Sequence, residues 1–110
     1  QGSIGKNNNV PSLRYTYVTA IEKNTGKGKF AIKGGDATTG KLKTFYEDKS
    51  PYGTMKKQGA IILGSGGDCC YSNMNGSKGV FYEGAIVAGY PDDATEDKIQ
   101  ENIVSAGYGK

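Results

Sequence analysis

The sequence predicts an all-β protein, mostly antiparallel, that forms a β-sandwich or part of one, with a single short helix near the C-terminus. Three observations predict this fold class. The 110 residues include 18 Gly and 8 Tyr but no Trp, and 35% are hydrophobic, a composition that suits short strands joined by glycine-rich turns. Apolar and aromatic residues gather in short runs between these turns. Only one stretch has the start signal and spacing of a helix.

The length bounds the chain to one domain or a piece of one. Residues 1–12 (QGSIGKNNNVPS) are rich in Gly and Asn and lack an apolar period, which indicates an arm or linker. Residues 13–110 are expected to form the sandwich.

Three strands are expected in the first half of this region. Residues 14–21 (RYTYVTAI) are aromatic and β-branched, as strands prefer. Residues 29–33 alternate between lysine and apolar side chains, as does a half-buried strand, and residues 41–46 form a third alternating run. Glycine-rich turns at 24–28 and 34–40 separate them.

Two further strands are expected in the second half. Residues 59–64 (GAIILG) form a continuous apolar run, which is typical of a strand buried on both faces. Residues 80–90 (VFYEGAIVAGY) form the longest expected strand, and Pro91 ends it. Loops are expected at 48–57 and 64–78.

The helix is predicted over residues 94–106. Asp93 and Glu96 have the spacing of a capping box, and acidic residues in the first turn suit the helix dipole. Gly107 is placed to end the helix. An apolar stripe is expected to pack on the sheet: Ile99, Ile103 and Ala106.

The net charge of +3 comes from scattered lysines and a single arginine, Arg14. The densest basic stretch, residues 23–33, spreads across a turn and a strand, whereas nucleic-acid-binding proteins usually cluster basic residues on one face. This pattern is typical of a solvated edge that lysines keep soluble. No nucleic acid is expected as a partner.

The chain contains no His, which excludes the commonest general base and any triad built on imidazole. An enzyme made from it must work with carboxylates. No apolar run approaches the ~20 residues that span a bilayer, so no membrane is expected as a partner. Asn75 begins an N-x-S glycosylation sequon, which weakly favours a secreted, extracellular protein.

Two carboxylates have a context that suits a site. Asp68 follows two glycines in a loop after the apolar run 59–64; by itself, this pattern is most typical of an ordinary turn aspartate. Glu83 interrupts an apolar strand and either contacts substrate or, the favoured interpretation, faces water. The remaining turn and cap carboxylates are interpreted as local hydrogen-bond formers: Asp36, Glu47, Asp48, Asp92 and Asp93.

Cys69 and Cys70 are adjacent and leave three alternatives open: two free buried thiols, a vicinal disulfide, or bonds to other cysteines. In an oxidising compartment a disulfide is expected, with the vicinal form slightly favoured. No metal site is expected, because two adjacent cysteines without His lack the ligands of a structural zinc site. Tyr52 and Tyr71 lie in loops and are candidates for stacking on a sugar ring.

From residue 10 onward the chain resembles the later part of the catalytic domain of glycoside hydrolase family 54, the α-L-arabinofuranosidases. The matching stretches keep the family's order and approximate spacing. They are YTYVTA at 15–20, FAIKGGDATTG at 30–40, GAIILGSGGD at 59–68, GVFYEGAIVAGYPDDATED at 79–97 and QENIVSA at 100–106.

This resemblance implies a concanavalin- or laminin-G-like sandwich that, without a cofactor, releases terminal arabinofuranose from plant-wall polysaccharides with retention of configuration. It implies that Asp68 is the general acid/base and that Gly67 lines the sugar pocket. The family's nucleophile, a glutamate, lies in the earlier half of its domain and has no counterpart here. The family's vicinal cysteine pair also lies in that half, so Cys69 and Cys70 depart from its pattern.

Two hypotheses follow. In the first, the chain is part of a split or processed arabinofuranosidase, and another protein chain supplies the nucleophile. In the second, it is a non-catalytic extracellular protein that binds glycan or assembles with copies of itself. A carboxylate about 5 Å from Asp68 would favour catalysis, since a retaining glycosidase needs such a pair.

Overall fold

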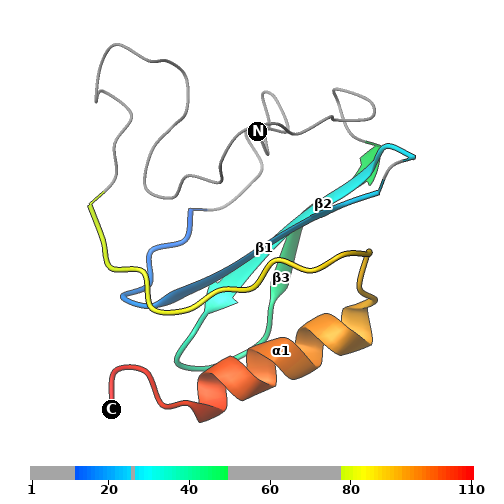
Figure 1. The fold of residues 1–110 in the computed structure, drawn as a ribbon. Coiled ribbons are helices and arrows are strands. Elements are labelled where there is room, and N and C mark those ends of the chain that lie inside the picture. The colour runs from blue at the N-terminus through cyan, green and yellow to red at the C-terminus, as the bar shows by residue number, and fades with distance from the viewer. Residues whose placement is uncertain (1–11, 26, 50–77) are drawn as a thin grey trace. The chain divides into compact units, whose positions relative to one another are not determined.

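The computed structural model describes residues 12–25, 27–49 and 78–110. Within them lie strands β1 (Val18–Asn24), β2 (Lys29–Asp36) and β3 (Lys43–Lys49) and helix α1 (Asp93–Ser105) (Figure 1). The chain divides into two compact units; residues 12–49 and 89–110 belong to one, and residues 78–88 to the other. The predicted strand at 59–64 and most of the predicted arm lie outside the described residues.

The three strands form an antiparallel sheet in the order β1-β2-β3. Val18 lies opposite Asp36 and Asn24 opposite Phe30. The register between β2 and β3 shifts between Ile32 and Lys33, where β3 carries an extra residue. The antiparallel arrangement predicted for this part of the chain is therefore confirmed.

The strands lie further along the chain than predicted. The first was expected at 14–21 but runs Val18–Asn24, because the connection to β2 is tight: the backbone N of Thr25 donates to the carbonyl of Lys29 at 2.8 Å. Gly28 completes this turn with a φ of +81°, a conformation that glycine adopts without strain. β2 was expected to end at residue 33 but continues to Asp36, since ladder pairing with β1 requires only backbone groups.

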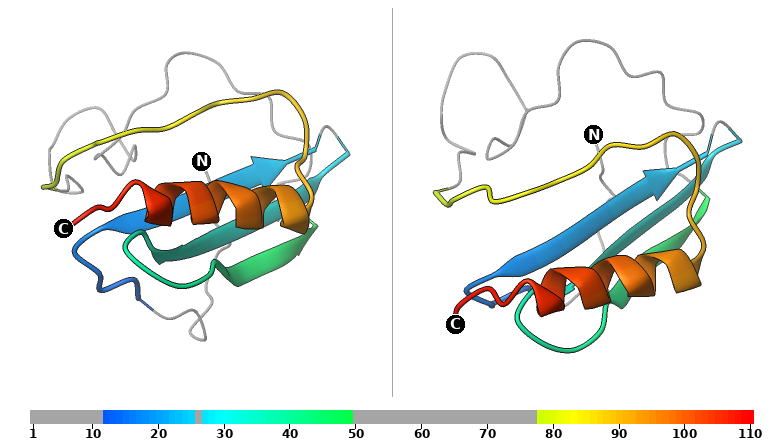
Figure 2. Two further views of the ribbon diagram at one scale, coloured as in Figure 1. Left: turned by 90° about the horizontal axis from the view of Figure 1, so that it is seen from below. Right: turned by 60° about the horizontal axis from the view of Figure 1, so that its bottom comes forward.

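The central strand β2 carries the core of this unit. Phe30 and Ala31 are both buried although they point to opposite faces, and Phe30 packs against Tyr46 with ring centroids 6.0 Å apart. Helix α1 lies along one face of the sheet (Figure 2). Both faces of β2 are thus covered, each by different groups. The alternating sequence of this strand predicted burial of one face only.

Helix α1 matches its predicted range to within a residue, but its N-cap differs. The cap is Asp92, whose carboxylate accepts a hydrogen bond from the backbone N of Thr95 at 2.8 Å. The predicted capping box of Asp93 and Glu96 is wrong by one position, because Asp92 is the residue with extended backbone. The predicted stop is confirmed: Gly107 has a φ of +78°, and its N donates to Val104 O.

The predicted packing face of α1 is wrong. Its buried residues are Glu96 and Gln100, whereas Ile99 is 43% exposed, Ile103 is half-buried and Ala106 is exposed. The reason lies in the sheet, which presents the ammonium groups of two buried lysines to the helix. A carboxylate can be buried there only because those cations accompany it.

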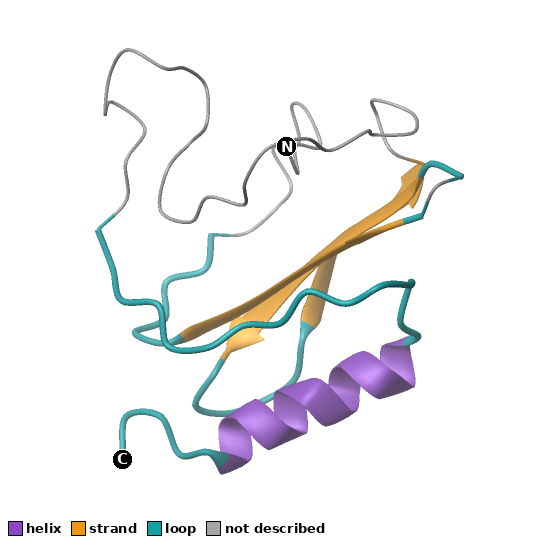
Figure 3. Ribbon diagram, viewed as in Figure 1, coloured by secondary structure: helices purple, strands orange, loops and turns teal. Residues whose placement is uncertain are grey.

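Residues 78–88 of the other unit contain no strand, contrary to the prediction for 80–90, and are drawn as loop (Figure 3). A strand is defined by its ladder hydrogen bonds to a neighbour, and within residues 12–25, 27–49 and 78–110 no strand pairs with this run. Every side chain from 78 to 88 is exposed.

Gly34→Val should destabilise this unit by about 1–3 kcal/mol. A Cβ at Gly34 would lie 2.8 Å from Leu13 Cδ1 and 2.9 Å from Phe45 Cε2, and 3.2 Å from the carbonyl oxygen of Thr19. Chemical denaturation followed by circular dichroism measures the effect. Gly79→Val is the control, since nothing lies within 4 Å of its Cβ position; equal losses in the two variants would contradict the steric explanation.

Candidate functional site

Most predicted site residues lie outside the described residues: Tyr52, Gly67, Asp68, Cys69, Cys70, Tyr71 and Asn75. Glu83 is the exception. It lies in the exposed segment 78–88 and takes part in an interaction there. Of the predicted site, the described part of the chain therefore contains only Glu83.

The most strongly interacting polar group in the described residues is a lysine–carboxylate cluster made of Lys23, Lys33, Asp93 and Glu96. Lys33 Nζ donates to Glu96 Oε2 and, at 2.6 Å, to Asp93 Oδ1. Lys23 Nζ lies 2.8 Å from Glu96 Oε1 and 3.8 Å from Asp93 Oδ1. The Glu96 side chain is completely buried, and both lysines are nearly so.

The register of the sheet places both lysines on one face. Ile21 lies opposite Lys33, and Lys23 lies opposite Ala31, so the two lysines are diagonal neighbours on adjacent strands. The first turn of α1 supplies Asp93 and Glu96, which are three residues apart and therefore lie on the same side of the helix. Four side chains from three elements thus meet at one point.

The charges in this cluster reinforce one another. Burial lowers the pKa of the Lys33 ammonium, but hydrogen bonds to Asp93 and Glu96 and the charges of both carboxylates outweigh burial, so the pKa of Lys33 is raised above its ordinary value. The hydrogen bond from Lys33 and its positive charge hold the pKa of Asp93 below the ordinary 3.8. Both shifts favour the charged forms.

Tyr90 extends the cluster toward the turn between β1 and β2. Its ring centroid lies 4.4 Å from Lys23 Nζ and 4.8 Å from Lys29 Nζ, which are cation–π distances. Its hydroxyl lies 3.4 Å from Glu47 Oε1, and burial together with the charge of Glu47 raises the pKa of Tyr90. Lys23 also donates to the carbonyl of Pro91 at 2.8 Å, which fixes the chain just before α1.

A second polar contact holds the middle of the helix. Gln100 Nε2 donates to the backbone carbonyl of Asp36 at 2.8 Å. The Asp36 carboxylate meanwhile accepts from the backbone N of Thr38 at 2.8 Å and from its hydroxyl at 2.7 Å. Asp36 is therefore the local hydrogen-bond former that the sequence predicted.

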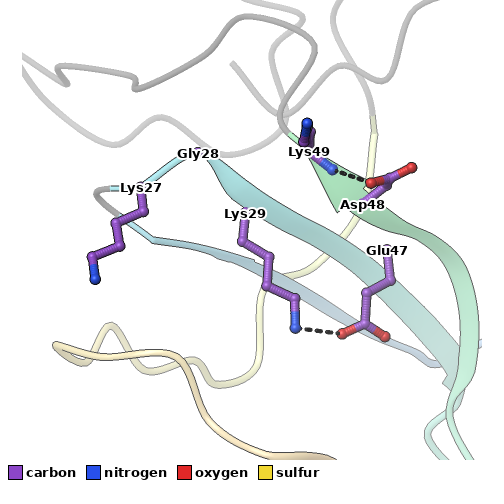
Figure 4. Close-up of a pocket in the computed structure, with 6 residues that line it drawn as sticks. All are labelled: Lys27, Gly28, Lys29, Glu47, Asp48 and Lys49. Carbon is purple, nitrogen blue, oxygen red and sulfur yellow. Dashed lines mark hydrogen bonds and ion pairs between the residues drawn. The ribbon is translucent and has the colours of Figure 1, made fainter.

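An open hollow of about 550 Å³ lies at the end of the sheet where β2 begins and β3 ends (Figure 4). Its carboxylates are engaged: Glu47 pairs with Lys29 at 3.5 Å, and Asp48 accepts from the backbone N of Lys49 at 2.7 Å. A second hollow of about 350 Å³ is bordered by Tyr15 and Phe45 over a floor of Gly34 and Gly35. Neither hollow contains a pair of carboxylates free for acid–base chemistry.

The prediction that lysines 23–33 form a solvated edge is wrong for Lys23 and Lys33. Both are buried, because the face they occupy is covered by α1 rather than by water. A signal for this existed in the sequence: Lys23 alternates with Ile21, and Lys33 with Ala31, so each lysine shares a face with an apolar neighbour. Lys27 and Lys29 are exposed, as predicted.

The described residues contain no group of three His, Cys, Asp or Glu side chains that could hold a metal ion. No helix among them has the length and hydropathy needed to cross a membrane.

Glu96→Gln should destabilise this unit by about 3–5 kcal/mol, because it leaves two buried ammonium groups without their main counter-charge. Thermal and urea denaturation measure the loss, and Glu101→Gln, on the exposed side of the same helix, is the control. Replacing the three buried members of the cluster with Lys23→Met, Lys33→Met and Glu96→Leu should recover most of the lost stability. A single variant as stable as the Glu101→Gln control would contradict the role of Glu96.

The stability of this unit should depend on pH at two limits. Asp93 has a lowered pKa, so its contribution is present above the unfolded value of 3.8 and is lost as the pH falls through the folded value. Lys33 has a raised pKa, so its contribution is present below 10.5 and is lost as the pH rises beyond it. The melting temperature should therefore be flat between about pH 5 and 10 and fall outside this range.

Asp93→Asn should flatten the acid side of this profile, whereas Asp97→Asn, an exposed substitution on the same helix, should not. Melting temperatures measured at constant ionic strength test both variants. If the melting temperature of Asp93→Asn fell at low pH as much as that of the unmodified chain, the ion pair between Asp93 and Lys33 would not be the cause of the fall.

Comparisons with known proteins identify the family. The model of the α-L-arabinofuranosidase B catalytic family matches residues 1–109. α-L-arabinofuranosidase B of Aspergillus niger is 50% identical over 108 residues, which cover 94% of this chain and 21% of the relative. An α-L-arabinofuranosidase of Hypocrea jecorina is 49% identical over 110 residues, which cover 96% of this chain and 21% of that protein.

Solved structures of arabinofuranosidases also match this chain. An arabinofuranosidase complexed with arabinofuranosyl-α-1,2-xylobiose has a TM-score of 0.75 at 50% identity, covering 88% of this chain and 20% of the other. A GH54 α-L-arabinofuranosidase soaked with a cyclic sulfate inhibitor has a TM-score of 0.74 with the same identity and coverage.

The three-stranded sheet and helix α1 are accordingly part of the β-sandwich of these enzymes. The chain spans about a fifth of the length of the relatives it matches. With its match over nearly all residues, the chain belongs to the α-L-arabinofuranosidase B catalytic family.

Proposed function

We propose that this chain supplies the acid/base part of a retaining α-L-arabinofuranosidase that removes terminal arabinofuranose from plant-wall polysaccharides. The family match over residues 1–109 carries the proposal. The substrate class is supported by a relative of 50% identity that was solved with arabinofuranosyl-α-1,2-xylobiose. Secretion accords with such a substrate, and Asn75 would then be a glycosylation site.

In this proposal Asp68 protonates the glycosidic oxygen as a carboxylate nucleophile attacks the anomeric carbon. Asp68 then removes a proton from the water that releases arabinose from the covalent intermediate. Gly67 leaves room for the sugar beside Asp68, since glycine allows close approach of backbone and ligand. The nucleophile comes from a part of the family's domain that has no counterpart in this chain, so hydrolysis requires another polypeptide segment.

Six of the described carboxylates support this choice indirectly, because they have structural partners. Asp36 holds Thr38, Asp92 caps α1, and Asp93 and Glu96 neutralise buried lysines. Glu47 and Asp48 are also engaged. None of these six is left for proton transfer to a sugar.

The remaining predicted residues would shape the pocket around Asp68. Tyr52, Tyr71 and Glu83 are proposed to contact the substrate. Cys69 and Cys70 follow Asp68 directly, and a vicinal disulfide between them would stiffen the loop that carries the acid.

Asp68→Asn should lower hydrolysis of arabinofuranosyl-xylobiose by about 10²–10⁴-fold when the chain is combined with the nucleophile-bearing remainder of the domain. The loss should be much smaller with 4-nitrophenyl α-L-arabinofuranoside, whose leaving group needs little protonation. Initial rates on both substrates measure the difference.

The chain offers a matched control, because Gly34-Gly35-Asp36 repeats the Gly66-Gly67-Asp68 triplet. Asp36→Asn keeps an oxygen that accepts from Thr38 and should leave both rates nearly unchanged. Equal activity of Asp68→Asn and Asp36→Asn on arabinofuranosyl-xylobiose would remove Asp68 from the mechanism.

A further inference from the structure

We propose that an ordered water molecule is buried beneath helix α1, where it joins the hydroxyl group of Thr19 on β1 to the side-chain oxygen of Gln100 on α1. The site goes beyond the proposed function and involves none of its residues. It lies within residues 12–49 and 89–110, which belong to one compact unit. The water adds a further hydrogen-bonded contact between the helix and the sheet, beside the lysine–carboxylate cluster.

The evidence begins with two buried oxygens. In the described ranges, Thr19 Oγ1 and Gln100 Oε1 are enclosed without a hydrogen-bond partner, and the two residues are only 6% and 1% exposed. Buried polar side-chain atoms almost always have a partner, either a protein group or an ordered water. Glu96 Oε1 also lacks a well-directed hydrogen bond, but Lys23 Nζ neutralises it from 2.8 Å. Thr19 and Gln100 are therefore the residues that need a partner.

Both side chains lie in the layer between α1 and the sheet. Side chains alternate between the two faces of a strand, so Thr19 points to the same face as Lys23, four residues further along β1. That face is the one that α1 covers, since Lys23 pairs with Glu96 of the helix. Gln100 follows Glu96 by four residues and therefore lies on the same side of α1, one turn further along.

The register brings the two side chains to the same point along the sheet. Gln100 Nε2 donates to the carbonyl of Asp36, and Asp36 follows Gly35, which lies directly opposite Thr19. Gly35 leaves the space beside Thr19 free of a side chain, and the carbonyl oxygen of Lys41 lies 3.0 Å from the position that a Gly35 Cβ would take. A third polar atom thus borders the site.

Hydrogen-bond chemistry identifies the occupant as water. The Gln100 amide is fixed in orientation, because its NH2 group donates to Asp36 and a flip would set two acceptors against each other. Its oxygen can only accept, so the occupant must donate to it, whereas the Thr19 hydroxyl can donate to the occupant. A water that accepts from Thr19 and donates to Gln100 and Lys41 has the three hydrogen bonds typical of buried water.

The surrounding charges argue against a metal cation at this point. The lysine–carboxylate cluster contains two ammonium groups and two carboxylates, so it contributes no net negative charge that would hold a cation. Neither Thr19 nor Gln100 carries a charge. The site therefore takes a neutral molecule that both donates and accepts hydrogen bonds.

A crystal structure of the unmodified chain, at a resolution that shows ordered water, tests the site directly. One water oxygen should lie about 2.5–3.0 Å from both Thr19 Oγ1 and Gln100 Oε1. A direct hydrogen bond between these two side chains, or ordered water elsewhere but none at this point, overturns the proposal. In solution, a long-lived water should give a nuclear Overhauser effect to the side-chain NH2 protons of Gln100, and absence of this signal counts equally against the site.

Thr19→Val should expel the water, because valine has nearly the shape of threonine but no hydroxyl. The nuclear Overhauser effect at Gln100 should then fall to the background level. Thr19→Ser keeps the hydroxyl and should keep the signal. Thr44→Val, the same substitution at an exposed position of β3, is the matched control and should leave the signal unchanged. A signal of full size in Thr19→Val removes Thr19 from the site.

Paired substitutions separate the water from ordinary packing. Gln100→Met removes the acceptor oxygen but keeps a long side chain. If one water joins the two residues, Thr19→Val should lower the melting temperature roughly half as much in the Gln100→Met background as in the unmodified chain, or less. Equal decreases in both backgrounds contradict a shared water. Should Thr19→Val fail to fold, the crystal structure of the unmodified chain still decides.

Discussion

The buried carboxylate of Glu96 is the constraint on which the described unit depends. A carboxylate completely removed from water is tolerated only with counter-charges and hydrogen bonds around it, and Lys23 and Lys33 provide them from two adjacent strands. The strand pairing, the diagonal placement of the lysines and the position of the first helical turn are therefore mutually dependent. Moving any one of them would leave a charge buried without its partner.

This arrangement gives the contact between helix and sheet an unusual character. The buried helix residues are polar, and the buried hydrophobic residues of the described ranges are only Phe30, Ala31 and Ala37. Apolar surfaces are non-directional and tolerate sliding, whereas ion pairs and the bond from Gln100 to the Asp36 carbonyl fix individual atoms. Buried ion pairs contribute little net stability compared with apolar packing, so their effect here is to fix the alignment of α1 on the sheet.

Sequence patterns predicted the elements better than the contacts between them. The three strands and the helix follow from local alternation, turn glycines and capping residues, and those signals act over a few neighbouring positions. The face of α1 did not follow, because Ile99 and Ile103 form the more apolar stripe while Glu96 and Gln100 face the sheet. The buried face of α1 is set by Lys23 and Lys33, which lie about sixty to seventy residues away in the sequence. The hydrophobic period of the helix sequence alone cannot indicate such a distant contact. The strand predicted at 80–90 is absent for a related reason, since none of the strands in the described ranges pairs with this segment. Of the predicted site only Glu83 falls within the described residues, so Asp68 still rests on family resemblance.

The burial of Lys23 and Lys33 also divides the lysines of this unit into two chemical classes. Reagents that acylate amines require a neutral, accessible nitrogen. These two ammonium groups are buried against the carboxylates of helix α1, and the Tyr90 ring also covers that of Lys23. Lys27, Lys29, Lys41, Lys43 and Lys49 are exposed to the same reagents. The labelling pattern of this chain is thus a built-in reporter of whether α1 is seated on the sheet, readable from a peptide map without any introduced probe.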